Sequence, residues 1–370
     1  MTGESMTSRH WLALSLLPKL GARRLAQIRQ QQPSWPEGWL AALPGEARHQ
    51  LMVWLHDPQR SPLNEDIERA MAWLEGGSGR HLLTPSHPAW PGLLDELPDP
   101  PPVLWGWGDL AALTPPALAM VGTRRPTREG RDNALGFSRA LAEYGFTIVS
   151  GMALGIDGRA HEAALDAGGW TIAVLGCGVD VLYPRTHRRL RQRLLENGGL
   201  LLSEHLPGTA ARAPFFPRRN RIITGLSLGV LVVEAARRSG SLVSARLAME
   251  QNREVFALPG SLHNPQASGC LWLIQEGARL VTCRDELLSE LPESGRVEGV
   301  THPAPMAPIN VTCPDDPLWT HLSNVPCPLD QLVELSGVAV SDCQQRLLML
   351  ELEGWAAQAP GGWVRRNTTA

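Results

Sequence analysis

The stretch "TIVSGMALGIDGRAHEAALDAGGWTIAVLG", residues 147–176, alternates two short apolar runs with a helical pattern. Runs 147–151 and 171–176 predict buried strands, and segment 158–167 predicts a helix between them. A strand, a crossover helix and a second strand form the unit of a parallel sheet. The alternation continues on both sides, with further strands predicted at 118–122, 200–204, 229–235, 254–260 and 278–282, and further helices at 127–144, 187–196, 241–251 and 268–276. The sequence therefore predicts an α/β fold with a doubly wound parallel sheet.

The segments that flank this alternation have other patterns. Residues 8–75 are helical in pattern, and Pro18 and Gly21 separate two short apolar segments in "WLALSLLPKLGARRLAQI". This turn resembles a helix-hairpin-helix, whose backbone amides can meet a phosphate, although we favour the alternative of a plain structural hairpin. We therefore predict a small helical domain (SAM-like or helix-hairpin-helix-like) at 1–80, the α/β domain at 81–292, and a proline-rich linker at 293–316.

The remaining segment, 317–370, shows a winged-helix pattern. It reads as two helices, a turn at Ser336 and Gly337, a third helix, and a two-stranded wing that turns at residues 360–362. Winged helices often read DNA, but residues 316–370 hold six acidic side chains against three arginines. Because phosphate neutralisation supplies most non-specific DNA affinity, we favour a protein-contact or regulatory role for this domain.

Composition limits the class of protein. The chain has 370 residues, of which 43% are hydrophobic and 19% are charged, as expected for two or three globular domains. Its apolar runs are much shorter than the roughly 20 residues that a membrane span needs, and its start makes a poor signal peptide. Six scattered cysteines have no CxxC spacing. We therefore expect a cytoplasmic protein with reduced thiols, without a membrane segment, a metal site or a cofactor.

Positive charge is concentrated in one region. Residues 185–253 hold 13 arginines against four glutamates, a local charge of +9 in a chain whose net charge is −3. This asymmetry predicts a local anion site on an acidic body. A solvated helix face is an equally good interpretation of the arginines at 185–193.

The loops that follow the predicted strands suggest where that anion binds. In doubly wound sheets, ligands bind outside the carboxyl ends of the strands. Glycines and hydroxyl side chains gather there, and arginines arrive at the same rim: Gly122, Thr123, Arg124, Gly151, Gly155, Gly176, Gly178, Arg185, Arg218, Arg219, Arg221, Ser239, Gly240 and Ser241. Asp157 is expected to cap the following helix. These residues predict a phosphate-bearing ligand, which can be a nucleotide or a polynucleotide.

The motifs "VGTRRPTREG" (121–130), "LGCGVDVLYPRTH" (175–187), "FPRRNRIITG" (216–225) and "VVEAARRSGS" (232–241) stand in this order along the chain. With them, the sequence resembles the DNA-processing protein A family (DprA, also called Smf). The resemblance implies an extended Rossmann-like domain that binds single-stranded DNA rather than a dinucleotide cofactor. It also implies a homodimeric recombination mediator that protects incoming DNA and loads RecA in natural transformation.

The resemblance also assigns residues. It places Arg124, Arg185, Arg212 and the "RRNR" group, Arg218, Arg219, Asn220 and Arg221, at the DNA. Phe215 or Phe216 is the base-stacking candidate, and a buried staple under the loop is an equal alternative for either ring. Two positions depart from the family pattern. Leu154 replaces a basic residue, and Leu271 with Trp272 stands where an asparagine is common, so we assign no polar contact to these positions.

A nucleotide-binding or nucleotide-hydrolysing Rossmann-like enzyme is the alternative function. Related enzymes carry a "PGGxGT" loop followed by a catalytic glutamate, whereas Glu234 precedes the glycine here. We therefore expect Glu234 to cap a helix or to order a loop, and the chain not to be an enzyme. An NAD-dependent oxidoreductase is rejected because the first strand is not followed by GxGxxG.

Overall fold

The computed structural model describes residues 6–291, 314, 316–323 and 326–366. The chain forms two compact units, residues 1–300 and 301–370, which we describe separately. Apart from residues 314 and 316, the predicted linker 293–316 lies outside the described residues. In the described part of the chain, no helix combines the length and the apolarity needed to cross a membrane.

All seven predicted strands form, and they lie in one sheet. They are parallel and run in the spatial order β6-β5-β4-β3-β7-β8-β9. Their bounds are β3 (Ala117–Val121), β4 (Thr147–Ser150), β5 (Thr171–Val174), β6 (Leu200–Ser203), β7 (Gly229–Val232), β8 (Glu254–Ala257) and β9 (Arg279–Leu280). Because β3 has β4 on one side and β7 on the other, the winding direction of the chain reverses there. This is the switch point at which doubly wound sheets bind ligands.

Two strands that we did not predict extend the sheet beyond β6. β1 (Arg80–Leu83) and β2 (Leu104–Gly108) are antiparallel to their neighbours, with Trp105 opposite Ser203. The sheet is therefore parallel in its seven predicted strands and mixed at this edge. Gly106 and Gly108 interrupt the apolar run of β2, and glycine weakens the sequence pattern of a strand.

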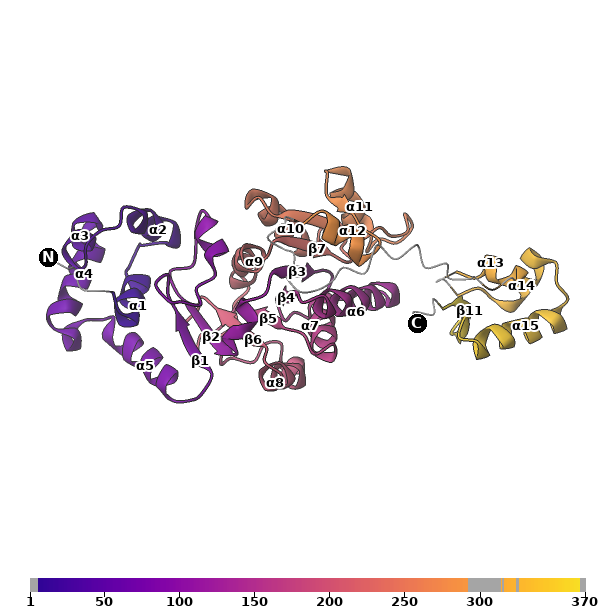
Figure 1. Cartoon of the computed structure of the whole chain (residues 1–370), viewed down its shortest axis with the longest axis horizontal. Coiled ribbons are helices and arrows are strands. Elements are labelled where there is room, and N and C mark those ends of the chain that lie inside the picture. The colour runs from indigo at the N-terminus through magenta and orange to yellow at the C-terminus, as the bar shows by residue number, and fades with distance from the viewer. Residues whose placement is uncertain (1–5, 292–313, 315, 324–325, 367–370) are drawn as a thin grey trace. The chain divides into compact units, whose positions relative to one another are not determined.

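Helices cover both faces of the sheet (Figure 1). One face packs on α9 (Phe215–Gly225), α10 (Ser241–Glu250) and α11 (Ser268–Gln275), and the other on α6 (Arg128–Glu143), α7 (Ile156–Asp166) and α12 (Arg284–Ser289). Val230 and Val232 of β7 face the first group, whereas Leu231 and Val233 face the second. This alternation follows from the two-residue period of a strand. A further helix, α8 (Arg188–Glu196), packs on the β5–β6 side of the sheet.

Helix α9 was missed by the sequence analysis. Pro217 and three arginines in "FFPRRNR" hide its apolar face, but the proline is the third residue of the helix. Proline is tolerated in the first turn, where its missing N–H would have no helical partner. Beyond that turn, Ile222 and Ile223 are buried in the core of the sheet.

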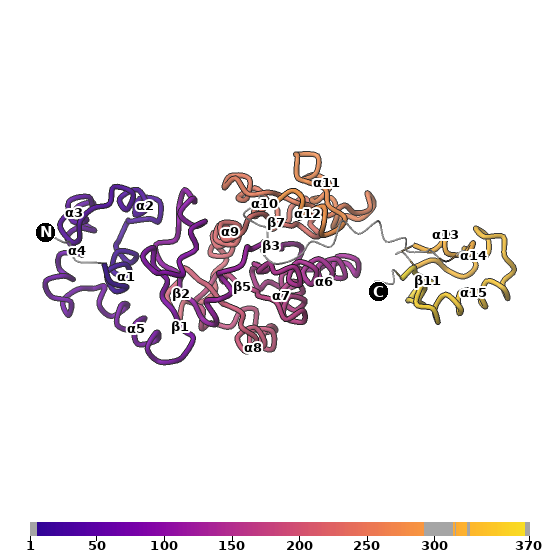
Figure 2. Tube along the Cα trace, in the orientation of Figure 1, coloured from indigo at the N-terminus to yellow at the C-terminus, as the bar shows by residue number. Residues whose placement is uncertain are grey.

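The N-terminal helices share a core with the edge of the sheet. Their buried cluster includes Trp11, Leu12 and Ile67 and continues into Leu82 of β1 and Trp105 of β2. The chain passes directly from α5 into β1 (Figure 2). These helices are α1 (Ser8–Leu16), α2 (Ala22–Gln30), α3 (Glu37–Ala42), α4 (Gly45–His56) and α5 (Asn64–Glu75). A domain boundary at residue 80 stays a prediction, because both sides of it belong to one compact unit.

The second unit has the predicted winged-helix order. Helices α13 (Pro317–His321), α14 (Leu329–Ser336) and α15 (Val340–Leu352) precede the wing strands β10 (Ala356–Ala359) and β11 (Gly362–Arg365). Gly337 ends α14 with a φ of 68°, a left-handed conformation that suits glycine. Cys343, Leu347 and Leu350 form the buried face of α15.

Candidate functional site

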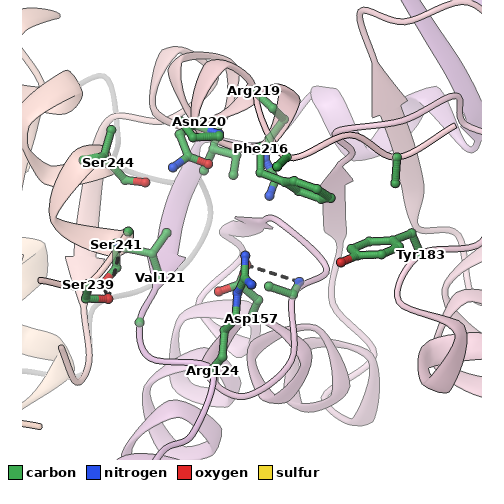
Figure 3. Close-up of a pocket in the computed structure, with 18 residues that line it drawn as sticks. Val121, Arg124, Asp157, Tyr183, Phe216, Arg219, Asn220, Ser239, Ser241 and Ser244 are labelled. Carbon is green, nitrogen blue, oxygen red and sulfur yellow. Dashed lines mark hydrogen bonds between the residues drawn. The ribbon is translucent and has the colours of Figure 1, made fainter. Parts of the chain in front are cut away.

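A pocket of about 500 Å³ lies at the carboxyl ends of β3 and β4, between their loops and helices α9 and α10 (Figure 3). An adjoining pocket of about 60 Å³ extends it toward the loop after β5. The two pockets are lined by ten of the predicted site residues: Gly122, Arg124, Gly151, Gly176, Phe216, Arg219, Asn220, Ser239, Gly240 and Ser241. The site therefore lies at the switch point of the sheet.

The remaining predicted residues lie outside these two pockets. Thr123 donates its backbone N–H to Glu234 O at 2.7 Å, and Gly178 donates to Thr209 O at 2.9 Å. Gly155 begins α7 as its N-cap with a φ of 82°. The others are Arg185, Arg212, Phe215, Arg218 and Arg221, and their surroundings separate them into exposed and buried groups.

Arg219 forms part of the floor of the pocket rather than its rim. Its guanidinium donates to the carbonyl of Gly151 at 2.8 Å and to the carbonyl of Val174. A Cβ added at Gly151 would lie 2.5 Å from Nη2 of this guanidinium, so glycine is needed there for Arg219 to pass. Burial lowers the pKa of Arg219 to about 10, while the Asp157 carboxylate acts in the opposite direction. Arg219 is therefore still a cation at neutral pH, held by the carbonyls of Gly151 and Val174.

Asp157 does not cap its helix, contrary to our expectation. The N-cap of α7 is Gly155, and the Asp157 carboxylate accepts from the backbone N–H of Gly151 at 3.1 Å and of Ala153 at 3.4 Å. Burial raises the pKa of Asp157, and Arg219 and these two amides oppose that shift. Asp157 thus orders the loop after β4 from beneath.

Arg221 is buried on the side of α9 that faces away from this pocket. It forms ion pairs with Glu204 at 2.7 Å and with Asp99 at 2.9 Å. With 4% of its side chain exposed, Arg221 has no access to a ligand in this conformation. A DNA contact by Arg221 stays a prediction that the structure does not support.

Three of the predicted arginines are exposed and make no ion pair among the described residues: Arg124, Arg185 and Arg212. Arg124 extends from the end of β3 toward the middle of the pocket (Figure 3). Arg185 begins the short 3₁₀ helix η4 (Arg185–His187), next to the pocket residue Tyr183. The guanidinium of Arg212 lies 5.9 Å from the ring of Phe215. A ligand at this rim can reach these three side chains.

The two phenylalanines have different neighbours. Phe216 lines the pocket, and its ring lies 5.1 Å from the ring of Tyr183. Phe215 stacks instead on His205, with ring centroids 4.1 Å apart. Figure 3 shows Phe216 and Tyr183 on one side of the pocket and the serines on the other. Phe216 is therefore the ring that a ligand in this pocket meets.

The opposite wall is formed by the start of α10. Ser239 and Ser241 share a hydrogen bond of 2.6 Å between their hydroxyls, and no side chain caps the helix at Gly240. A helix N-terminus favours anions because the helix dipole places partial positive charge there. The first amides of α10 already have acceptors, since Ser241 N–H donates to Ser239 Oγ at 3.3 Å and the next two amides donate to backbone carbonyls. This wall thus offers serine hydroxyls at the positive end of a helix, opposite an aromatic surface.

Glu234 holds the loops together behind the pocket. Its carboxylate accepts from the N–H and the hydroxyl of Thr127, each at 2.8 Å, and from Asn264 at 3.3 Å. Thr127 is the N-cap of α6, so the charge of Glu234 lies near the start of that helix. The expected loop-ordering role of Glu234 is confirmed by these contacts.

Sequence reasoning missed two lining residues that carry hydroxyl groups. Tyr183 is 45% exposed and stands two positions before Arg185 in the motif that we had already singled out. Ser244 lies one turn after Ser241 in α10. The proximity of Tyr183 to that motif and the helical spacing of the serines were the signals that pointed to them. Among the described residues, no three His, Cys, Asp or Glu side chains are placed to hold a metal ion.

Comparison with known proteins gives consistent matches. The family model "DNA recombination-mediator protein A" matches residues 81–292, and the "DprA winged helix domain" matches residues 302–362. Protein Smf of Escherichia coli (strain K12) is 45% identical over 310 residues, which cover 81% of each chain. DNA processing protein DprA of Streptococcus pneumoniae is 47% identical over 201 residues, 54% of this chain and 71% of that one.

Two solved structures share this fold. The X-ray structure of DNA processing protein A from Streptococcus pneumoniae has a TM-score of 0.66 at 33% identity and covers 78% of this chain and 99% of that one. DNA processing protein A from Helicobacter pylori, described for its single-stranded DNA binding mode, has a TM-score of 0.51 at 33% identity. That match covers 57% of this chain and 98% of the other.

Proposed function

This chain belongs to the DNA recombination-mediator protein A family, also called DprA or Smf, and from that premise we propose that it binds single-stranded DNA in the pocket at β3, β4 and α9. The observation that carries the proposal is the presence of an exposed cation, an aromatic ring and the positive end of a helix around one pocket. They belong to Arg124, Phe216 and the start of α10.

Each of these groups suits one part of a single strand. Arginine and helix amides bind phosphate oxygens without reading sequence. An aromatic ring stacks on any base, which is worth about 1 to 3 kcal/mol per base. Because Phe216 lines the pocket while Phe215 stacks on His205, we assign base stacking to Phe216. The single-stranded DNA binding mode described for the Helicobacter pylori relative supports the same ligand class.

Binding of this kind needs no reaction, and we propose that the chain is not an enzyme. The contacts of Glu234 with Thr127 and Asn264 support a structural role for this carboxylate. The competing function is hydrolysis of a nucleotide. Purified protein should release no product from labelled nucleotides or from DNA, and turnover that Glu234→Gln abolishes would establish the enzyme instead.

We further propose that the protein works in the cytoplasm as a homodimer, protects incoming DNA, and loads RecA onto it during natural transformation. Membership of the family supports this part of the proposal. Sedimentation of the purified chain over a range of concentrations tests the dimer. The rate at which RecA coats a DNA strand already covered by a single-strand-binding protein tests loading.

The site is tested by removing, one at a time, an exposed cation that lines the pocket and one that lies beside it. Arg124→Ala and Arg185→Ala should each weaken binding of an oligothymidine and reduce the magnitude of the salt slope by about 0.7 for each phosphate that the variant no longer neutralises. The matched control is Arg246→Ala, because Arg246 is exposed on α10, pairs with Glu250 at 3.7 Å and lines neither pocket. A double variant of Arg124 and Arg185 that binds as tightly as the parent would overturn the proposal.

A further inference from the structure

A second large pocket, of about 480 Å³, lies between the N-terminal helices and the loop after β6. It is lined by the turn from α1 to α2, by Trp105, by residues 204–206 and by Arg218. The first turn of α9 joins this second pocket to the site described above, because Pro217 lines the first pocket and Arg218 lines the second. A single DNA strand that crosses this turn of the helix passes from one pocket to the other.

Two cationic side chains line the second pocket. The side chain of Lys19 is 81% exposed, and that of Arg218 is 56% exposed. Glu204 also lines the pocket; it is 6% exposed, pairs with Arg221 at 2.7 Å and is approached by Arg218 at 3.4 Å. Lys19 pairs with the exposed Glu46 at 2.9 Å, and such surface pairs are weak enough for a phosphate to compete. The charged side chains of the lining are therefore two exposed cations and one buried carboxylate.

Unpartnered donors lie in the same lining. Gly21 is the N-cap of α2, a helix of nine residues, and no side chain caps its first N–H groups. Trp105 is fully buried, lines the pocket, and has an indole N–H without a hydrogen-bond partner in the described part of the chain. Free helix amides beside two cations suit a phosphate group.

An aromatic stack connects the two pockets. Phe215, at the start of α9, stacks on His205, which lines the second pocket. Burial lowers the pKa of His205, which favours the neutral imidazole at neutral pH. The guanidinium of the exposed Arg212 lies 5.9 Å from the centre of the Phe215 ring. An aromatic pair and an exposed cation thus lie beside the second pocket.

We propose that the second pocket receives the continuation of the same single strand, with one phosphate held by Lys19, Arg218 and the first amides of α2. The inference rests on the proposed function and extends it, because it assigns a DNA contact to the N-terminal helices. Oligomers that fill only the first pocket would not make this contact, whereas longer ones would.

Position 21 permits a sharp test. A Cβ added at Gly21 would have no heavy atom within 4 Å, and the residue has an ordinary φ of −74°. Gly21→Asp places a preferred N-cap on α2, so the helix keeps its stability. The carboxylate of the Gly21→Asp variant accepts hydrogen bonds from the free amides of α2 and repels phosphate. Gly21→Asn occupies the amides without the charge, and Gly21→Ala leaves them free.

The four proteins are titrated with oligothymidines of about 5 and about 20 nucleotides. For the longer oligomer, Gly21→Asp should weaken binding by about threefold to tenfold, Gly21→Asn by less, and Gly21→Ala not at all. The salt slope of Gly21→Asp should also fall in magnitude by about 0.7. The shorter oligomer should bind all four proteins equally.

Gly45→Asp is the matched control, because Gly45 starts α4, has the same free space and lines neither large pocket. Unchanged binding of the longer oligomer by Gly21→Asp would overturn the inference, as would an equal loss for both oligomers. Excess thymidine monophosphate should compete weakly for the longer oligomer, and strong competition would mean that the pocket takes a free nucleotide instead. A parent protein that binds neither oligomer would overturn the proposed function itself.

Discussion

The guanidinium of Arg221 lies 2.7 Å from the carboxylate of Glu204, and 4% and 6% of these two side chains are exposed. The pair joins α9 to the residue that follows β6, and Asp99 accepts a further hydrogen bond from Arg221 at 2.9 Å. A buried ion pair of this kind fixes the position of the helix that carries Phe216 and Arg219. The charge of Arg221 is therefore neutralised by carboxylates within the fold.

Arg221→Met should lower the free energy of unfolding by about 3 to 5 kcal/mol, because it leaves the Glu204 carboxylate buried without its closest cation. Adding Glu204→Gln should restore part of this loss, since a neutral amide tolerates burial better. Urea unfolding of the parent, both single variants and the double variant gives the coupling energy.

The control for this cycle is Arg218→Met. Arg218 approaches the same carboxylate at 3.4 Å, but its side chain is 56% exposed. Arg218→Met should lower the free energy of unfolding by less than about 1 kcal/mol. If the effects of Arg221→Met and Glu204→Gln on the free energy of unfolding are strictly additive, the two side chains do not stabilise each other and the prediction is wrong.

Phe216→Leu should weaken binding of an oligothymidine by about tenfold, because one stacked base is worth about 1 to 3 kcal/mol. Its salt slope should not change, since every cation that meets a phosphate is still present. Tyr183→Leu should act in the same direction, because Tyr183 packs beside Phe216. Fluorescence titrations at several salt concentrations measure both quantities.

Phe215→Leu is the comparison for that variant. Phe215 stacks on His205 outside the first pocket, so its removal should leave binding of short oligomers unchanged. A larger effect at Phe215 than at Phe216 for short oligomers would reverse our assignment of the stacking ring.

His161 should make stability depend on pH. It is fully buried, its Nδ1 lies 2.6 Å from the Thr171 hydroxyl, and burial lowers its pKa from 6.5 to about 3. Between these values the unfolded chain binds a proton that the folded chain does not. Stability should therefore fall as the pH decreases from about 6.5 toward 3, by up to about 1.4 kcal/mol per pH unit.

His161→Asn removes this titration and retains a polar atom near the Thr171 hydroxyl. Its stability should vary less steeply between about pH 4 and pH 6.5 than that of the parent. His263→Asn is the control, because His263 is exposed. Urea unfolding at several pH values gives the slopes, and parallel curves for His161→Asn and the parent would refute the assignment.

The winged helix should contribute little to DNA affinity. On α15, Leu348 and Leu352 are exposed, and Arg346 lies 3.5 Å from Asp316. Because this helix carries one arginine against Asp342 and Glu351, it offers little charge neutralisation to a phosphate backbone. A chain that ends near Pro308 should keep most of its affinity for single-stranded DNA, while a fragment of residues 316–370 should bind negligibly at physiological salt.

Gel-shift titrations of both fragments against one oligonucleotide check this expectation. A loss of more than about tenfold in the shortened chain, roughly 1.4 kcal/mol, would place a DNA site in the winged helix. It would also mean that the excess of acidic side chains in the domain does not prevent it from binding DNA.

Local sequence patterns determined the seven parallel strands, most of the helices, the winged-helix order and the rim on which the site lies. These features follow from hydrophobic periodicity and turn residues, which act over a few positions. The antiparallel strand β2 and helix α9 lacked such patterns, because glycine interrupts one and proline with arginines disguises the other.

The roles of the arginines were decided by tertiary structure. Arg218, Arg219 and Arg221 are almost adjacent in sequence, yet one is exposed and two are buried. Arg219 meets the carbonyl of Gly151, 68 positions away, and Arg221 meets Asp99, 122 positions away. A guanidinium goes to whichever acceptors the packed chain brings to it, because burying a charge without partners is costly. Composition therefore showed where cations gather, and packing decided which of them a ligand can reach.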